Sequence, residues 1–453
     1  MEINTAIVAG TGKSGISATK LLVNHGVKVY LFDENKDRDI EAIKEKTGDS
    51  ELVQIELGEL GEDALSSSQL MVISPGIPVD APFTDVVRNA GIPIWSEIEL
   101  AYHYGKGKIV AITGTNGKTT TTALVGEIVK AHNAKTIVVG NIGIPYTELC
   151  DTTDDDSDTV AEISSFQLET VIDFHPNVSA ILNLTPDHLN RHYTFENYGN
   201  VKFSITKNQT MDDVTVLNYD DEHTRAMGEK AKDHCHVVYF SRLEKPAGGV
   251  YVEDGDIILE DGDKKINVLA IKDLKLMGAH NVENVLAAVG ISYYMGVPVD
   301  VIRDVATSFK AVAHRIEYVD TVDGVAYYND SKGTNPDAAI KGIQAMVAPT
   351  FLIGGGYDKG SEYDEWIEAF DGKVKWLVLI GQTAQKIADC AKRHGFNSII
   401  FEENLQDAVA YCHENAVDGD AVLLSPACAS WGQFDNYEQR GDMFKEYVRS
   451  YKE

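Results

Sequence analysis

The sequence has few basic residues for its length. Its 453 residues include 40 Lys and Arg against 70 Asp and Glu, which gives a formal net charge of −30. Such a charge repels polyphosphate backbones and anionic membranes unless a local basic patch overrides it. We therefore expect no nucleic acid as a partner, and the charge itself predicts only a well-solvated surface.

Long hydrophobic runs are also missing from the sequence. No window reaches the roughly 18 continuous apolar residues that a membrane-spanning helix needs. The first residues, 1–4, lack the basic region of a secretory signal. We expect no membrane insertion and a cytoplasmic protein.

Cysteine is scarce and forms no recognisable pattern. The cysteines are odd in number and widely scattered, and none belongs to a C-x-x-C pair that would suggest zinc or a redox dithiol. We expect reduced thiols that serve mostly as small core residues. The five cysteines are Cys150, Cys235, Cys390, Cys412 and Cys428.

Core material, in contrast, is plentiful. Apolar residues make up 43% of the chain, and at about 150 residues per domain the length predicts about three domains. Short β-branched runs alternate with helical stretches throughout, which is typical of parallel βαβ sheets. We predict an α/β protein with an N-terminal Rossmann-like domain (1–97), a central P-loop ATPase-type domain (98–311) and a C-terminal Rossmann-like domain (312–453).

The strands can be placed by their apolar runs. The acidic run 151–158 is expected to be a solvated loop, because that many like charges cannot pack together. The main predicted strands are 6–8, 28–32, 109–113, 136–139, 159–163, 178–184, 214–218, 316–319, 325–328, 350–353, 376–380 and 421–424.

A first glycine loop, residues 10–15, fits the pattern G-x-G-x-x-G between a strand and a helix, and Asp33 ends the next strand. By itself this pattern predicts a dinucleotide such as NAD. Its physical content is broader, because glycines and a helix N-terminus accept any diphosphate, including that of a nucleotide sugar. A tight turn without a ligand is the third interpretation.

A second glycine loop, residues 114–121, is more specific. It places Lys118 and Thr119 at the start of a helix, directly after a strand and a glycine turn. Backbone donors, one ammonium and a hydroxyl for magnesium are what a triphosphate requires. Ile112 stands where the generic motif has its first glycine, so the loop is shorter than usual.

Polar residues follow two further strands of the central domain. Glu162 closes one strand, and the cluster 185–192, which includes His188, follows another. Ligands bind beyond the carboxyl ends of parallel strands, and a magnesium ion on Thr119 needs further oxygen ligands. We therefore expect Glu162 and His188 to belong to the nucleotide site.

Several motifs together resemble the Mur ligases, and the resemblance spans all three predicted domains. Within that family the N-terminal loop, the segment 74–77 and the segment 424–430 resemble the branch that adds D-glutamate. The motifs that carry the family resemblance lie at 114–119, 162–169, 183–189, 278–281, 314–315 and 329–335.

The resemblance implies an ATP-dependent ligase of peptidoglycan precursor synthesis that joins UDP-N-acetylmuramoyl-L-alanine to D-glutamate through an acyl phosphate. The implied catalytic residues are Lys118, His188, Lys202 and Arg315. The implied ATP-binding residues are Gly114, Thr115, Asn116, Gly117, Lys118, Thr119, Thr120, Asn281, Arg315 and Asp330.

The resemblance also overrides the NAD interpretation of the first loop and gives it to the UDP-substrate. The implied UDP-substrate residues are Gly12, Lys13, Ser14, Asp33, Gly76 and Asn141. The implied D-glutamate residues are Lys332, Thr334, Lys359, Ser430 and Tyr437. The implied ligands of two Mg²⁺ ions are Thr119, Glu162, His188 and a carbamylated Lys202.

The chain departs from the family pattern at Gly432, where aspartate is common, and at Tyr437, where phenylalanine is common. Other classes remain as alternatives: a nicotinamide-dependent oxidoreductase, a non-catalytic nucleotide-gated binding protein, a folylpolyglutamate synthetase or another Mur-type ligase. The UDP-type N-terminal domain argues against the synthetase, and the lack of an Asp-Asn-Pro-Arg motif argues against the lysine and diaminopimelate ligases. We expect a monomer.

Overall fold

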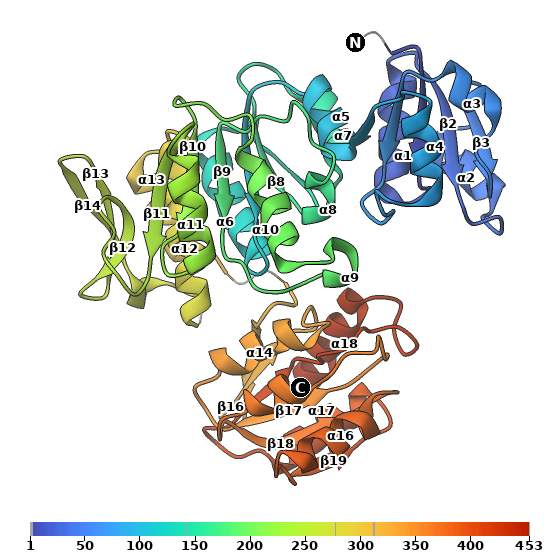
Figure 1. The fold of residues 1–453 in the computed structure, drawn as a ribbon. Coiled ribbons are helices and arrows are strands. Elements are labelled where there is room, and N and C mark those ends of the chain that lie inside the picture. The colour runs from blue at the N-terminus through green and yellow to red at the C-terminus, as the bar shows by residue number, and fades with distance from the viewer. Residues whose placement is uncertain (1–2, 142, 277, 311–312, 453) are drawn as a thin grey trace. The chain divides into compact units, whose positions relative to one another are not determined.

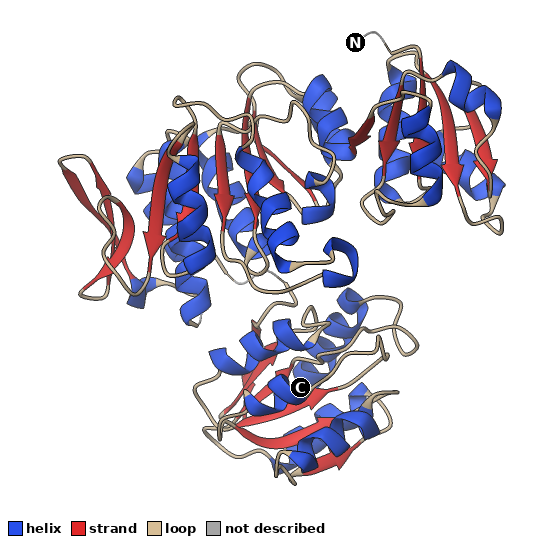
Figure 2. Cartoon of the chain, in the orientation of Figure 1, coloured by secondary structure: helices blue, strands red, loops and turns tan. Residues whose placement is uncertain are grey.

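The computed structural model describes residues 3–141, 143–276, 278–310 and 313–452. The chain divides into two compact units. The first unit contains Met1–Asp273 and Glu283–Thr307, and the second contains Leu274–Val282 and Ser308–Glu453. Three separate sheets run through them, two in the first unit and one in the second (Figures 1 and 2). The predicted boundary at 311/312 falls on residues outside the described ranges.

The N-terminal sheet has five parallel strands in the order β3-β2-β1-β4-β5. Its central strand is a continuous apolar run with no exposed surface from Ala6 to Ala9, as expected where helices cover both faces of a parallel sheet. The strands are β1 (Thr5–Ala9), β2 (Lys28–Asp33), β3 (Val53–Leu57), β4 (Leu70–Ile73) and β5 (Ile94–Ser96). The helices are α1 (Lys13–Asn24), α2 (Ile40–Thr47), α3 (Glu62–Ser67), α4 (Pro82–Asn89) and α5 (Glu97–Tyr104).

The central sheet has nine strands in the order β14-β13-β12-β11-β10-β9-β6-β8-β7. The strands are β6 (Lys108–Thr113), β7 (Ile137–Gly140), β8 (Asp158–Glu162), β9 (Val178–Ile181), β10 (Val214–Asn218), β11 (His236–Ser241), β12 (Gly249–Glu253), β13 (Asp256–Asp261) and β14 (Lys264–Ala270). The helices are α6 (Lys118–His132), α7 (Tyr146–Leu149), α8 (Ser165–Leu168), α9 (Leu189–His192), α10 (Phe195–Phe203), α11 (Glu222–Ala231), α12 (Ala279–Tyr294) and α13 (Val299–Ser308).

Three features of the central sheet differ from the sequence prediction. Strand β11 and the antiparallel extension β12-β13-β14 were not among the predicted strands. The strand predicted over 178–184 ends at Ile181, and residues 182–184 are irregular and follow the glycine loop, where Asn183 O accepts a hydrogen bond from Thr115 N. Asp158, predicted to lie in a solvated loop, begins β8, whereas Asp154 and Asp156 lie outside the strand and pair with Lys135.

The C-terminal sheet has six strands in the order β15-β16-β20-β17-β18-β19. Only the pairing of β15 with β16 is antiparallel among its pairs. The strands are β15 (Glu317–Val322), β16 (Val325–Asn329), β17 (Thr350–Gly354), β18 (Val374–Leu379), β19 (Ile399–Phe401) and β20 (Ala421–Leu424). The helices are α14 (Pro336–Ala345), α15 (Asp364–Glu368), α16 (Ala384–Arg393), α17 (Leu405–Asn415) and α18 (Tyr437–Ser450).

Two predictions about what the chain lacks can be compared with the structure. All five cysteines are free and buried, which fits the prediction that they are small core residues. Across the described residues, every helix is too short or too polar to cross a bilayer.

Candidate active site

The second glycine loop connects the end of β6 to the first turn of α6. Gly114 has φ 146° and Gly117, the N-cap residue, has φ 85°, both in the left-handed region that favours glycine. A Cβ at Gly117 would also collide with the side-chain oxygen of Asn284. The loop therefore requires glycine at position 117 for two reasons: the backbone has a positive φ, and Asn284 leaves no room for a Cβ.

Two lysines converge on one carbonyl oxygen of this loop. Lys118 Nζ donates to Gly114 O at 2.8 Å and to Thr115 O at 2.9 Å, while Lys202 Nζ from α10 donates to the same Gly114 O at 2.9 Å. Lys202 is 2% exposed and also lies 3.3 Å from Thr113 Oγ1. Burial and the charge of Lys118 hold the pKa of Lys202 well below its ordinary value. The amine of Lys202 is therefore biased toward its neutral form.

Residues far along the chain brace the loop. Thr115 Oγ1 lies 3.1 Å from Tyr198 Oη and donates to Thr185 O at 3.1 Å, and Asn116 N donates to Asn183 Oδ1 at 2.8 Å. The sequence analysis assigned no role to Tyr198 or Asn183 as individual residues. Asn183 lay within a quoted motif, so that motif was the one available signal.

Glu162, at the end of β8, has the properties of a cation ligand. It is 2% exposed, and its Oε1 accepts a hydrogen bond from Asn141 Nδ2 at 2.9 Å. Its other oxygen, Oε2, is buried without a hydrogen-bond partner. An orphaned carboxylate oxygen is costly unless a cation satisfies it. Glu162 and the buried hydroxyl residue Thr119 therefore fit a magnesium site.

Asn141 was predicted to bind the UDP-substrate. The structure places it against Glu162, to which both its backbone N and its side chain donate. Its segment also approaches the first glycine loop, because Lys13 Nζ donates to Gly143 O.

His188 stands at the start of α9 with φ 52° and a half-exposed ring. Its Nε2 lies 3.4 Å from Asp187 Oδ2, and the ring contacts Phe166 at 4.8 Å between centroids. The neighbouring His192 is buried with its Nε2 2.9 Å from Ser165 Oγ, and burial lowers its pKa to about 4. His188 is thus the accessible imidazole of this turn, whereas His192 is a neutral packing residue.

Arg191, which the sequence analysis did not single out, ties α9 to the N-terminal sheet. Its guanidinium donates to both oxygens of Glu169, from Nε to Oε1 at 3.1 Å and from Nη2 to Oε2 at 2.5 Å. Nη2 also donates to Ile77 O at 2.7 Å. The turn that carries His188 is therefore fixed to the segment that follows β4.

The first glycine loop lines a pocket of about 480 Å³. Asp33 accepts hydrogen bonds there from Thr11 Oγ1 at 2.6 Å and Asn35 N at 3.0 Å and pairs with Arg38 at 3.2 Å. Burial alone would raise the pKa of Asp33, but these hydrogen bonds and Arg38 outweigh it and lower the pKa. The predicted residues that line this pocket are Gly12, Lys13, Ser14, Asp33 and Gly76.

In the second unit, Asp330 directly follows β16 and is almost fully buried. It accepts hydrogen bonds from Ser425 Oγ at 2.7 Å and Ile316 N at 3.3 Å. Burial raises its pKa to about 6 despite the opposing charge of Arg315. Arg315 keeps a buried Nε without a hydrogen-bond partner, which is a suitable donor for an anionic ligand.

Asn281 lies in the part of α12 that belongs to the second unit. It is 7% exposed. Its neighbour His280 has a pKa lowered to about 4 by burial and by the charges of Lys341 and Arg315. This places the segment of Asn281 close to Arg315, as the predicted ATP set requires.

Arg440, another residue that the sequence analysis did not single out, connects two loops of the second unit. It is fully buried, and burial lowers its pKa to about 10. Its guanidinium donates to Ser331 Oγ at 2.9 Å, to Ser331 O at 2.8 Å and to Cys428 O at 3.2 Å. One side chain therefore fixes the loop after β16 to the loop after β20.

The predicted D-glutamate residues lie on these loops and their neighbours. Lys332 Nζ lies 5.6 Å from the centroid of the Tyr437 ring, and Lys359 Nζ lies 5.0 Å from that of exposed Trp431. Ser430 is buried, beside the bridge that pairs Tyr357 with Ala429. Thr334 lies two residues after Lys332, where its backbone N donates to Lys332 O at 2.9 Å.

Three protein-family models match this chain, one for the region of each sheet. Residues 4–96 match the Mur ligase MurD-like N-terminal domain, residues 112–292 the Mur ligase middle domain, and residues 314–428 the Mur ligase glutamate ligase domain. The chain belongs to the Mur ligase family. The resemblance identified from sequence motifs is thereby confirmed, as is a fold of three α/β domains.

Relatives within the Mur ligases match along almost the whole chain. A UDP-N-acetylmuramoylalanine–D-glutamate ligase of Lachnospira eligens is 56% identical over 450 residues, covering 99% of both chains. A ligase with the same name from Clostridioides difficile is 46% identical, covering 98% of both chains.

Solved structures of other Mur ligases share the fold at low identity. MurC of Thermotoga maritima aligns with a TM-score of 0.61 and 19% identity over 99% of this chain and all of that one. MurF of Acinetobacter baumannii aligns with a TM-score of 0.62 and 16% identity over 97% of this chain and 93% of that one. At such identities these structures support the fold alone.

Proposed function

We propose that this chain joins D-glutamate to UDP-N-acetylmuramoyl-L-alanine with ATP, through an acyl phosphate, in peptidoglycan precursor synthesis. The observation that carries the proposal is 56% identity to a D-glutamate ligase over 99% of both chains. The test is a coupled assay of phosphate release against a panel of UDP-muramyl acceptors and amino acids. We expect release only with the L-alanyl acceptor and D-glutamate together. Equal release with another pair would overturn the substrate assignment.

The reaction needs activation because an amine does not displace oxide from a carboxylate. Transfer of the γ-phosphoryl group of ATP to the alanyl carboxylate gives an acyl phosphate, and the amine of D-glutamate then displaces phosphate. Crowding a carboxylate against a triphosphate requires positive charge. Lys118 supplies one ammonium at the glycine loop, and Mg²⁺, when bound, neutralises phosphate charge.

For ATP we propose contacts from the backbone of Gly114–Gly117 and from the side chains of Lys118, Thr119 and Thr120. Two Mg²⁺ ions are assigned to Thr119, Glu162, His188 and carbamylated Lys202. The orphaned Oε2 of Glu162 supports this assignment. Asn281, Arg315 and Asp330 complete the proposed ATP set, supported by the unpartnered Nε of Arg315.

For the UDP-substrate we propose Gly12, Lys13, Ser14, Asp33 and Gly76, with Asn141 from the central domain. The pocket around Asp33 supports the first five, and the MurD-like match of residues 4–96 favours a nucleotide sugar over NAD. For D-glutamate we propose Lys332, Thr334, Lys359, Ser430 and Tyr437, because a dicarboxylate needs ammonium and hydroxyl donors.

We also propose that Lys202 carries a carbamate. Only a neutral amine attacks carbon dioxide, and the buried position of Lys202 beside Lys118 favours the neutral form. In the step the amine nitrogen bonds to the carbon of CO₂ and a proton leaves to solvent. The product exchanges a cation that would repel Mg²⁺ for an anionic oxygen on a long stem.

Lys202→Ala tests the carbamate, and Lys207→Ala is its matched control, because Lys207 is a nearby lysine that donates to Val171 O. Loss of a metal ligand should lower kcat by about 100-fold or more with little change in UDP-substrate affinity. With ¹³C-bicarbonate we expect a carbamate NMR signal in the wild type and in Lys207→Ala but not in Lys202→Ala. A wild type without the signal under saturating bicarbonate would overturn the proposal.

The predicted domains at 1–97, 98–311 and 312–453 remain our proposal for the limits of the three binding functions. We further propose a cytoplasmic monomer, since ATP and nucleotide sugars are cytoplasmic substrates and the proposed site uses residues of one chain. Light scattering on the purified protein tests the monomer, and a dimer mass at assay concentration would contradict it.

A further inference from the structure

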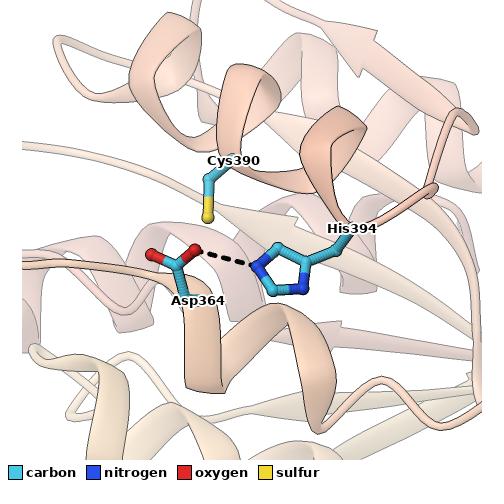
Figure 3. A group of neighbouring side chains, drawn as sticks. All are labelled: Asp364, Cys390 and His394. Carbon is cyan, nitrogen blue, oxygen red and sulfur yellow. Dashed lines mark hydrogen bonds and ion pairs between the residues drawn. The ribbon is translucent and has the colours of Figure 1, made fainter.

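Outside the proposed active site, three side chains of metal-binding type meet in the second unit. Asp364 begins α15, Cys390 lies in the last turn of α16, and His394 caps that helix (Figure 3). One ligand atom from each lies within 4.8 Å of the other two. Figure 3 shows the sulfur of Cys390 directed toward the space beside the ion-paired Asp364 and His394.

The spacing in the chain suits a shared ligand. Cys390 and His394 are four residues apart, so both project from one face of α16. Asp364 and Glu368 have the same spacing on α15, and Glu368 Oε1 lies 3.7 Å from His394 Nδ1. Two helices thus bring one thiol, one imidazole and one carboxylate together, and Glu368 lies at the other ring nitrogen of His394.

This donor set has the chemistry of a zinc site. Zn²⁺ binds thiolate, imidazole and carboxylate at about 2.0–2.3 Å in tetrahedral geometry, which separates the ligand atoms by about 3.3–3.8 Å. His394 Nε2 and Asp364 Oδ1 are 2.8 Å apart, so both would move by less than about an ångström to admit the ion. Mg²⁺, which prefers oxygen, does not suit a thiolate.

The cluster is accessible to an ion from solvent, and Arg393 is a cationic side chain that competes with the ion for Asp364. Cys390 is 2% exposed, whereas the side chains of Asp364 and His394 are 44% and 26% exposed, so an ion can enter from that side. Arg393 also reaches Asp364 Oδ1 at 3.4 Å, but its exposed side chain can swing into solvent. The second cluster of this kind among the described residues, Glu99, His103 and Asp173, lacks sulfur.

That second cluster also has less free capacity. The carboxylate of Glu99 already accepts backbone hydrogen bonds from Ile172, Asp173 and Phe174 at 2.7–3.0 Å. Those bonds account for its burial without any ion. In the first cluster, Cys390 packs in the core of the domain. The carboxylate of Asp364 is held there by the side chains of His394, Arg393 and Cys390, and by no backbone donor among the described residues.

We propose that Asp364, Cys390 and His394 bind one Zn²⁺ ion, with a water molecule as the fourth ligand and Glu368 as the partner of the other ring nitrogen of His394. The thiol proton of Cys390 leaves to solvent as the Zn–S bond forms. The ion would cross-link α15 to α16 and stabilise the C-terminal domain. The cluster is linked to one of the proposed substrate loops through Tyr363, the residue before Asp364. The Oη atom of Tyr363 lies 3.2 Å from Sγ of Cys428.

The test uses the full chain, stripped with a chelator and titrated with Co²⁺ and then with Zn²⁺. Cobalt bound to a thiolate gives a near-ultraviolet charge-transfer band that oxygen and nitrogen ligands do not give, so an ion at the Mg²⁺ site stays silent. We expect a band at one equivalent, which Zn²⁺ abolishes by displacing the cobalt. Zn²⁺ should also raise the midpoint of thermal unfolding.

Three variants and two controls make the result specific. Cys390→Ser should abolish the band, and His394→Ala and Asp364→Asn should weaken Zn²⁺ binding by more than the roughly 10–100-fold that loss of an outer-shell partner costs. The last two residues are partly exposed, so these variants fold even if Cys390→Ser does not. His413→Ala and Cys412→Ser, on α17, should bind as the wild type does. A wild type without the band, or a band that persists in Cys390→Ser, overturns the proposal.

Discussion

The chain contains the triplet glycine, lysine, hydroxyl residue twice, each time where a strand turns into a helix. Gly12-Lys13-Ser14 begins α1 and Gly117-Lys118-Thr119 begins α6. Yet Gly12 is extended at φ −77° whereas Gly117 is left-handed at φ 85°. Lys13 donates to Gly143 O on another segment, whereas Lys118 folds back onto its own loop.

The difference shows that the triplet alone does not define a triphosphate site. Successive backbone N–H groups at a left-handed glycine and a helix N-terminus can form a concavity that binds anions. In the first loop the lysine points to a neighbouring segment, and the negative Asp33 accepts hydrogen bonds from Thr11. We therefore assign the first loop to a sugar nucleotide and the second to ATP.

Alanine substitution of the two lysines should give the largest difference between the loops, and the difference should appear in the steady-state kinetics. Lys118→Ala removes the ammonium that balances phosphate charge, so kcat should fall by about 10²–10³-fold. Lys13→Ala should instead raise the KM for the sugar nucleotide and leave the KM for ATP unchanged. Steady-state phosphate release measures both. Near-normal release by Lys118→Ala would remove the second loop from the ATP site.

The two glycines should differ next, in stability. Gly117→Ala forces a Cβ into a left-handed conformation, at about 1–2 kcal/mol, and against Asn284. A Cβ at Gly12 meets no atom within 4 Å, so Gly12→Ala should lose only the preference for glycine over alanine at a helix N-cap, about 0.5–1 kcal/mol. Urea unfolding of both variants measures the contrast. Equal losses would show that the two turns are under the same constraint.

The smallest effect should come from the acid beside the first loop. The folded-state pKa of Asp33 is lowered, so its contribution to stability is present above its unfolded pKa of about 4 and is lost as pH falls through the folded value. Asp33→Asn lacks this contribution. The wild type should therefore exceed the variant in free energy of unfolding at pH 7, with the gap closing in acid. A gap that widens in acid would contradict the assigned direction.

The sequence predicted most strands and both glycine loops, because each depends on neighbours a few residues apart. Residues whose roles depend on distant partners were found less well. Lys202 was proposed only through the family resemblance, and its contact with Gly114 joins residues 88 positions apart. Arg440 and Asn284 carried no local signal, since an arginine or an asparagine in a helix is more often a surface residue. Strands β11–β14 were missed, although Asp254-Gly255 between β12 and β13 is a two-residue turn typical of a hairpin.

The position of Arg440 has a mechanical consequence. Ser331 lies next to Lys332, and Cys428 lies two residues before Ser430. The guanidinium of Arg440 therefore forms hydrogen bonds with both loops that carry the proposed glutamate site. These loops can therefore shift together but cannot open separately without stranding a buried charge. A change of amino-acid specificity at this site would therefore require substitution of side chains on these loops, because neither loop backbone can move away from the other.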